Sequence, residues 1–164
     1  MIQNYLEKYP LVANKVLFVD FGDELQKRIT NLKEKKYEEI KNVVYELVDE
    51  ILKKQPLLLS THLILNKNDE YCLDLKLEQK LNCGCYIHLV AKPEFILERR
   101  KKDKKESLEN LLLIDLHQKA SVNSAKILSE KLNCNFYILE NNNEYDLKKN
   151  ILALDKIIKK EIYP

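Results

Sequence analysis

The pattern of apolar and polar positions predicts strands and helices in alternation. Uninterrupted apolar runs predict short buried strands at Lys15 to Asp20, Leu57 to Ser60, Tyr86 to Val90 and Phe136 to Leu139. Such runs are typical of a sheet that is covered on both faces. From Ile40 to Ile51, apolar residues recur at steps of three and four, which predicts an amphipathic helix. The alternation as a whole predicts an α/β fold with a parallel sheet.

The connections between these elements carry further expectations. Phe21-Gly22-Asp23 is expected to form a turn in which Gly22 takes a positive φ and Asp23 caps the following helix. The polar stretch from Asn66 to Glu70 predicts a loop. Pro93 suits the first turn of a helix. Further helices are predicted at about 1–9, 24–54, 73–81, 108–132 and from about Leu147 to Ile158.

Length and charge exclude several classes of protein. The 164 residues suit a single domain, 1–164, and a hydrophobic content of 45% suffices for a core. The formal net charge is +2, from 28 basic and 26 acidic residues, so no nucleic-acid partner is expected. No apolar run approaches the ~20 residues that a membrane helix needs, so no membrane partner is expected. The first residues lack the pattern of a signal peptide, so a cytoplasmic protein is expected.

The cysteines leave one alternative open. In a cytosolic chain, free thiols are the default for Cys72, Cys83, Cys85 and Cys134. The alternative is a metal-binding regulator in which Cys72, Cys83, Cys85 and His88 bind zinc. The C-x-C spacing of Cys83 and Cys85 is, however, tighter than the usual C-x2-4-C. We therefore expect no metal site.

Two polar segments have both a functional and a structural interpretation. Ser60, Thr61 and His62 lie at the end of a predicted strand, where ligands bind in parallel α/β sheets, yet on pattern alone such residues more often satisfy the backbone polar groups of a loop. The basic run from Arg99 to Glu106 suits a lid that contacts anions, or simply a solvated helix. The whole chain has two glycines, Gly22 and Gly84, so it contains no glycine-rich phosphate loop.

Five short motifs occur in an order and spacing that are similar to those of one family. They are Phe18-Val19-Asp20-Phe21-Gly22, Leu58-Leu59-Ser60-Thr61-His62, Glu98-Arg99-Arg100 with Asp103, Asp115-Leu116-His117-Gln118, and Ile138 to Asn143. From about Tyr5 to its end, the chain thereby resembles the archaeal-type adenylate kinases, which exchange a phosphoryl group between ATP and AMP.

The resemblance implies a nucleotide site and its ligands. The partners implied are AMP and ATP, with Mg²⁺ as the cofactor that accompanies the nucleotide. Residues 99–110 would correspond to the lid. Gly22, Thr61 and His62 would line the monophosphate side, Arg99 and Arg100 would contact phosphates, His117 would belong to the same nucleotide site, and Asn141 would lie near the adenine of the donor.

The resemblance also implies a fold: a three-layer parallel sheet of the P-loop nucleotide kinase type, with about four strands and the central first strand missing. The place of that strand is expected to be taken by direct pairing of its neighbours, by a partner chain in a homo-oligomer that uses the exposed sheet edge, or by residues upstream of Met1. The expected function is binding of adenine nucleotides, with phosphoryl transfer only if the phosphate loop is supplied. The alternative is a non-catalytic scaffold or interaction protein on the same fold.

Overall fold

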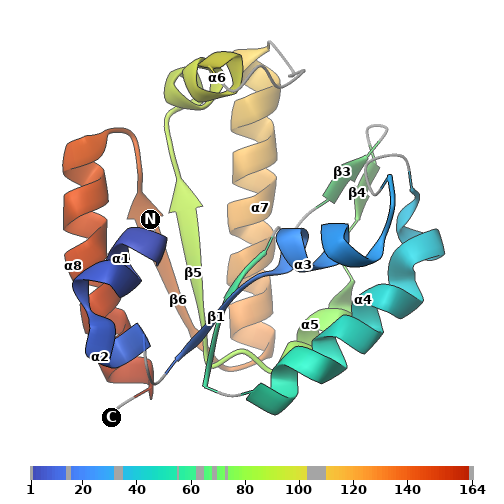
Figure 1. Ribbon diagram of the computed structural model, residues 1–164. Helices are drawn as coiled ribbons and strands as arrows, with labels where there is room; N and C mark the ends of the chain where they lie inside the picture. Colours follow the sequence, from blue (N-terminus) through green and yellow to red (C-terminus); the bar gives the residue numbers. More distant parts are fainter. Residues whose placement is uncertain are drawn as a thin grey trace. The chain divides into compact units, whose positions relative to one another are not determined.

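The protein is a mixed α/β chain that divides into two compact units (Figure 1). The computed structural model describes residues 2–13, 16–31, 35–54, 56–61, 65–67, 70–72, 74–102 and 110–162. The first unit comprises Met1–Tyr5 and Cys83–Pro164, and the second comprises Leu6–Asn82. Each unit is described by itself below.

The second unit contains a parallel pair of strands and an antiparallel hairpin. Strand β1 (Leu17–Asp20) pairs in parallel with β2 (Leu57–Ser60), and β3 (Leu65–Lys67) pairs with β4 (Glu70–Cys72). The hairpin corrects the expectation of a loop from Asn66 to Glu70: strand pairing there overrides a polar composition that is typical of loops. The helical elements are α2 (Pro10–Ala13), α3 (Phe21–Arg28), α4 (Tyr37–Ile51), the 3₁₀ turn η2 (Leu52–Lys54) and α5 (Leu75–Leu81); α1 (Ile2–Lys8) precedes them.

Helix α4 supplies much of the core of the second unit. Its buried residues are Ile40, Val44, Leu47, Val48 and Ile51. They repeat at steps of three and four and so form one face, as the sequence pattern predicts.

The turn after β1 differs from the sequence expectation. Helix α3 begins directly at Phe21, and the carboxylate of Asp20 caps it by accepting a hydrogen bond from the Asp23 amide at 3.2 Å. Gly22 therefore lies in the first helical turn, and neither glycine of the chain has a positive φ. The cap is Asp20 rather than Asp23, because the strand passes into the helix without an intervening turn.

The first unit is built on a second parallel pair of strands. Strand β5 (Cys85–Val90) pairs with β6 (Asn135–Glu140) from Cys85 opposite Asn135 to Val90 opposite Glu140. Its helices are α6 (Pro93–Lys102), α7 (Leu111–Lys131) and α8 (Glu144–Ile162). Helix α8 buries Ile151, Leu154, Ile157 and Ile158, which form the apolar stripe expected near the end of the chain.

All four strands predicted from apolar runs are present: β2 has the predicted ends, and the ends of the other three differ by at most two residues. In the described residues these four strands form two two-stranded parallel sheets, one in each unit. Two-stranded sheets are marginal by themselves. Each pair therefore depends on the helices of its own unit.

Asparagine, not glycine, takes the left-handed positions of the described backbone. Asn31, Asn82 and Asn133 have φ values of 55°, 46° and 51°, and each follows the end of a helix. Asparagine tolerates this conformation better than other residues with a Cβ atom, but glycine tolerates it at less cost.

We therefore expect Asn82→Gly to raise the free energy of unfolding by about 0.5 kcal/mol. Asn110 is the matched control, because it has a φ of −96° and caps α7 through its side chain. Asn110→Gly should lower the unfolding free energy by a few tenths of a kcal/mol, about the cost of losing a cap to glycine. Urea denaturation of the two variants measures whether their unfolding free energies change in opposite directions. Changes in the same direction would contradict the left-handed conformation of Asn82.

Candidate functional site

A hollow of about 400 Å³ lies at the carboxyl ends of β5 and β6 in the first unit. The end of β5 and the residues after it form one side, α7 forms another, and the end of β6 forms a third. Its lining residues are Val90, Ala91, Lys92, Pro93, Asp115, Gln118, Lys119, Val122, Asn123, Glu140 and Asn142. Ligands of parallel α/β sheets bind at such strand ends, which makes this hollow the candidate site.

Gln118 anchors helix α7 to the chain that leaves β5. Its side-chain amide donates to the carbonyl of Ala91 at 2.7 Å, and its side-chain oxygen accepts from the Ala91 amide at 3.0 Å. Both polar groups of one backbone residue are thereby satisfied by one side chain. Gln118 belongs to a motif that the sequence singles out, but sequence reasoning assigned the nucleotide role to its neighbour His117 and missed Gln118 itself.

The connection from β6 to α8 is held by backbone and side-chain hydrogen bonds. The Asn141 amide donates to the Val90 carbonyl at 2.8 Å and so extends the ladder by one bond. The side-chain oxygen of Asn142 accepts from the Lys92 backbone amide at 2.7 Å, and the backbone amide of Asn142 donates to the Asp146 carboxylate at 2.9 Å. The rim of the hollow is therefore held in place by a network of hydrogen bonds.

Arg99 and Asn141, both predicted site residues, are brought together. The guanidinium of Arg99 donates to the carbonyl of Asn141 at 2.5 Å and to that of Asn142 at 3.0 Å. Arg99 thus contacts the backbone after β6, whereas sequence reasoning assigned it to phosphates. Arg100 and His117 are half-buried and do not line the hollow in the described part of the chain.

The lining combines apolar walls with a few polar groups. Val90, Pro93 and Val122 supply apolar surface. Asp115 and Lys119 form an ion pair at 2.6 Å. The side chains of Asn123 and Glu140 make no hydrogen bond or ion pair to the residues that the structure describes, and both are exposed. An amide and a carboxylate with open hydrogen-bonding capacity therefore face a hollow with apolar walls.

The monophosphate-side residues lie in the second unit. Gly22 and Thr61 each follow one of the paired strands, whose last residues Asp20 and Ser60 lie opposite one another. Thr61 is exposed, and His62 lies outside the described residues. The structure thus places Gly22 and Thr61 after adjacent strand ends of one unit, and Arg99 and Asn141 in the other unit.

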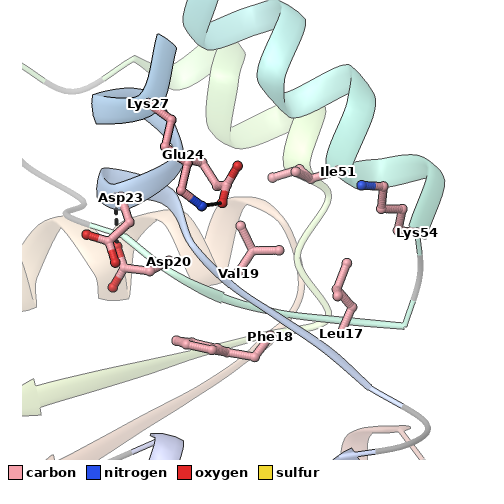
Figure 2. Close-up of a pocket in the computed structure, with 9 residues that line it drawn as sticks. All are labelled: Leu17, Phe18, Val19, Asp20, Asp23, Glu24, Lys27, Ile51 and Lys54. Carbon is pink, nitrogen blue, oxygen red and sulfur yellow. Dashed lines mark hydrogen bonds and ion pairs between the residues drawn. The ribbon is translucent and has the colours of Figure 1, made fainter. Parts of the chain in front are cut away.

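The second unit has a hollow of its own, of about 320 Å³, beside β1 (Figure 2). Neither Gly22 nor Thr61 is among its lining residues, which are Leu17, Phe18, Val19, Asp20, Asp23, Glu24, Lys27, Ile51 and Lys54. Asp20 and Asp23, on either side of Gly22 in the chain, do line it, so this hollow borders the predicted monophosphate side.

Neither His88 nor any described cysteine side chain is among the lining residues of the two hollows. Burial raises the pKa of the Cys85 thiol to about 11 and lowers the pKa of His88 below its ordinary value. Within the described ranges, no group of three or more His, Cys, Asp or Glu side chains could hold a metal ion. Cys72 lies in β4, and its side chain is outside the described part.

Among the described helices, none combines the length and the apolar character that crossing a bilayer requires.

Comparison with known proteins adds no relationship: no protein-family model matches the chain, and no curated protein matches it significantly.

Proposed function

We propose that this chain is a divergent nucleotide-kinase-like protein that binds adenine nucleotides, with the adenine in the hollow at the ends of β5 and β6. The observation that supports this most is the position of the hollow, beside Asn141 and on the helix that carries Asp115 and Gln118. These residues belong to two of the motifs that resemble adenylate kinases, and the strand-end position agrees with where parallel α/β proteins bind ligands.

The lining suits a purine base by its chemistry. A flat base needs apolar surface on its faces, which Val90, Pro93 and Val122 offer. Adenine carries an amino group that donates hydrogen bonds and ring nitrogens that accept them. The Glu140 carboxylate is an acceptor and the Asn123 amide includes a donor, so the pair complements adenine's amino group and ring nitrogens.

The phosphate side of the proposal is weaker in catalytic groups. Phosphoryl transfer depends on a backbone cradle, a lysine, arginines and Mg²⁺ around the phosphates. Arg99 is engaged with the carbonyls of Asn141 and Asn142, and the chain has no glycine-rich loop. We therefore propose binding without transfer unless a phosphate loop is supplied, with Mg²⁺ arriving bound to the nucleotide phosphates.

The three-layer sheet belongs to the same proposal. The two parallel pairs, β1 with β2 and β5 with β6, are the pairs that a four-strand remnant of such a sheet would keep if its central strand were missing. Helices follow β1, β5 and β6, as in doubly wound folds.

Titration calorimetry with ATP tests the adenine site. Val122→Phe should weaken ATP binding at least about tenfold, because the larger side chain fills a hollow that the base would occupy. Glu140→Ala should reduce the preference for ATP over GTP, because guanine presents a carbonyl where adenine presents its amino group.

Glu130→Ala is the control for this titration, because Glu130 is an exposed residue of α7 that does not line the hollow. It should bind ATP as the parent chain does. If the parent chain bound neither ATP nor AMP, the proposed function would be wrong; ATP binding that Val122→Phe leaves unchanged would place the base elsewhere.

A non-catalytic interaction protein is the second candidate, and the start of α7 favours it. Leu111, Leu112, Leu113 and Leu116 are exposed, Leu112 by 63%. Exposed apolar clusters of this kind are typical of interaction surfaces. This candidate predicts no ADP formation from ATP and AMP and no nucleotide binding, so the titration above separates the two functions.

A further inference from the structure

Four consecutive residues of β1 line the hollow of the second unit: Leu17, Phe18, Val19 and Asp20. Successive side chains of a strand point to opposite faces of a sheet. A hollow lined by four consecutive residues therefore reaches the backbone of the strand as well as side chains. No described residue of β2 lines it. The hollow therefore lies along the edge of β1 that faces away from β2.

The alternation of hydrogen-bonded residues between β1 and β2 shows which backbone groups of β1 face this outer edge. The Leu17 amide donates to the Pro56 carbonyl at 3.0 Å, and in a parallel ladder every second residue bonds to the same neighbour. Leu17 and Val19 therefore direct their backbone groups toward β2. Phe18 directs its amide and its carbonyl away from β2, toward the hollow, as do the Val16 carbonyl and the Asp20 amide.

The charges at this edge are ordered along the strand. Asp20 and Asp23 lie at the carboxyl end of β1, whereas Lys54 lies beside Leu17 at the amino end (Figure 2). Lys27 is already paired with Glu24 at 2.6 Å. The edge thus has an acidic end and a basic end, with apolar side chains between them.

We propose that β1 is a dimerisation edge, on which β1 of a second copy of this chain pairs antiparallel. An antiparallel second copy places its basic end against the acidic end of the first copy. Its acidic end then lies against the basic end of the first copy. Lys54 of each copy then lies near Asp20 and Asp23 of the other. Because the same patch complements itself, the two contacts are equivalent and the dimer has twofold symmetry.

The alternation of backbone groups limits the register of this pairing. Only Val16, Phe18 and Asp20 direct backbone groups outward, so the hydrogen-bonded pairs form among these residues. Among the registers that this allows, the one that pairs β1 along its whole length sets Phe18 opposite Phe18 and Asp20 opposite Val16, and this is the register of the proposed dimer. The side-chain pairs that follow are Phe18 with Phe18 and Leu17 with Val19, which are apolar, and Asp20 with Val16 at each end. Leu17 is 39% exposed in the single chain, which leaves apolar surface for the second copy to cover. This dimer uses the outer edge of the β1–β2 pair and does not depend on nucleotide binding.

Sedimentation of the whole chain over a range of concentrations tests the proposal. The parent chain should be a reversible dimer. Lys54→Glu should raise the dimer dissociation constant at least about tenfold, because it sets a carboxylate against Asp20 and Asp23 of the second copy. Lys53→Glu is the matched control, since Lys53 is exposed and does not line the hollow. The double variant Lys54→Glu with Asp23→Lys should restore dimerisation, because it exchanges the two ends.

Cross-linking tests the register. Paired Phe18 residues would place their Cα atoms about 5.5 Å apart, within the range that a disulfide spans. Phe18→Cys should therefore give a disulfide-linked dimer under mild oxidation, whereas Asp23→Cys and the parent chain should not. A monomer at all concentrations, a dimer that Lys54→Glu leaves unchanged, or a dimer without the Phe18→Cys cross-link would each overturn the proposal.

Discussion

Replacing Tyr5 with alanine is expected to lower the free energy of unfolding by about 4 kcal/mol, the usual cost of truncating a buried aromatic side chain. Tyr5 has no exposed surface and is among the largest fully buried side chains of the protein. Its hydroxyl donates to the carboxylate of Asp155 in α8 at 3.4 Å. Truncation removes the ring from the core of the first unit and leaves a cavity beside α8, and urea denaturation measures the loss.

Two further variants separate the contribution of the buried ring from that of the hydroxyl and from that of an exposed residue. Tyr5→Phe keeps the ring and removes the hydroxyl with its long hydrogen bond to Asp155, which retains its ion pair with Lys159 at 2.7 Å. Its cost should therefore stay near 1 kcal/mol, the typical value for one hydrogen bond. Leu152→Ala, on the same helix and 52% exposed, should cost about 0.5 kcal/mol or less. A loss for Tyr5→Ala no greater than that for Leu152→Ala would contradict the placement of α1.

Replacing Asp74 with alanine is expected to cost about 3 kcal/mol, because this carboxylate combines a helix cap with two charged hydrogen bonds. It accepts from the amides of Lys76 and Leu77 at the start of α5, at 3.0 and 3.1 Å. It also accepts from the hydroxyl of Tyr37 at 2.7 Å and from that of Tyr45 at 3.1 Å. One side chain therefore joins α4 to α5 within the second unit.

Asp49→Ala is the matched control, because Asp49 forms an exposed ion pair with Lys80 between the same two helices. Exposed pairs contribute about 0.5 kcal/mol. Should the two alanine variants lose equal stability, the Asp74 network would be no stronger than a surface contact. Tyr37→Phe and Tyr45→Phe, alone and together, then divide the effect between the two hydroxyls.

The Asp74 effect should depend on pH in a definite direction. Burial by itself would raise the pKa of Asp74, but the hydrogen bonds from Tyr37, the Leu77 amide and Tyr45 outweigh it and hold that pKa below its ordinary value of 3.8. A carboxyl with a lowered pKa stabilises the fold above its unfolded pKa and ceases to do so as the pH falls through the folded value. The stability difference between the parent chain and Asp74→Ala should therefore shrink in acid below about pH 4.

The apolar pattern of the sequence predicted the parallel strands and most of the helices. It did not predict features that depend on contacts between segments, such as the hairpin and the cap of α3. The apolar runs located all four parallel strands because burial selects such runs directly. The hairpin from Leu65 to Cys72 escaped notice, since its polar residues resemble those of a loop and its pairing is a contact between segments. The cap at Asp20 was assigned to Asp23 because a glycine between them suggested a turn.

The candidate site shows the same division. Sequence motifs pointed to Arg99 and Asn141, and the structure brings these two residues into contact, but through a backbone carbonyl. Of the lining residues, Asn123 belongs to no motif, and Glu140 lies in the Ile138 to Asn143 motif without having been assigned a role; the packing of α7 against β5 and β6 brings both to one hollow. The spacing of side chains along a helix identifies a face, but not the cavity that it borders.

The two-point contact between Gln118 and Ala91 has a consequence for which residues position 118 can accept. Glutamate offers the acceptor but lacks the donor, asparagine has both groups on a shorter arm, and leucine matches the shape with neither. Each replacement leaves at least one backbone group of Ala91 without this hydrogen bond. In a saturation scan scored for folding, all nineteen substitutions of Gln118 should therefore lower the folded fraction, whereas most substitutions of the neighbouring Lys119 should not.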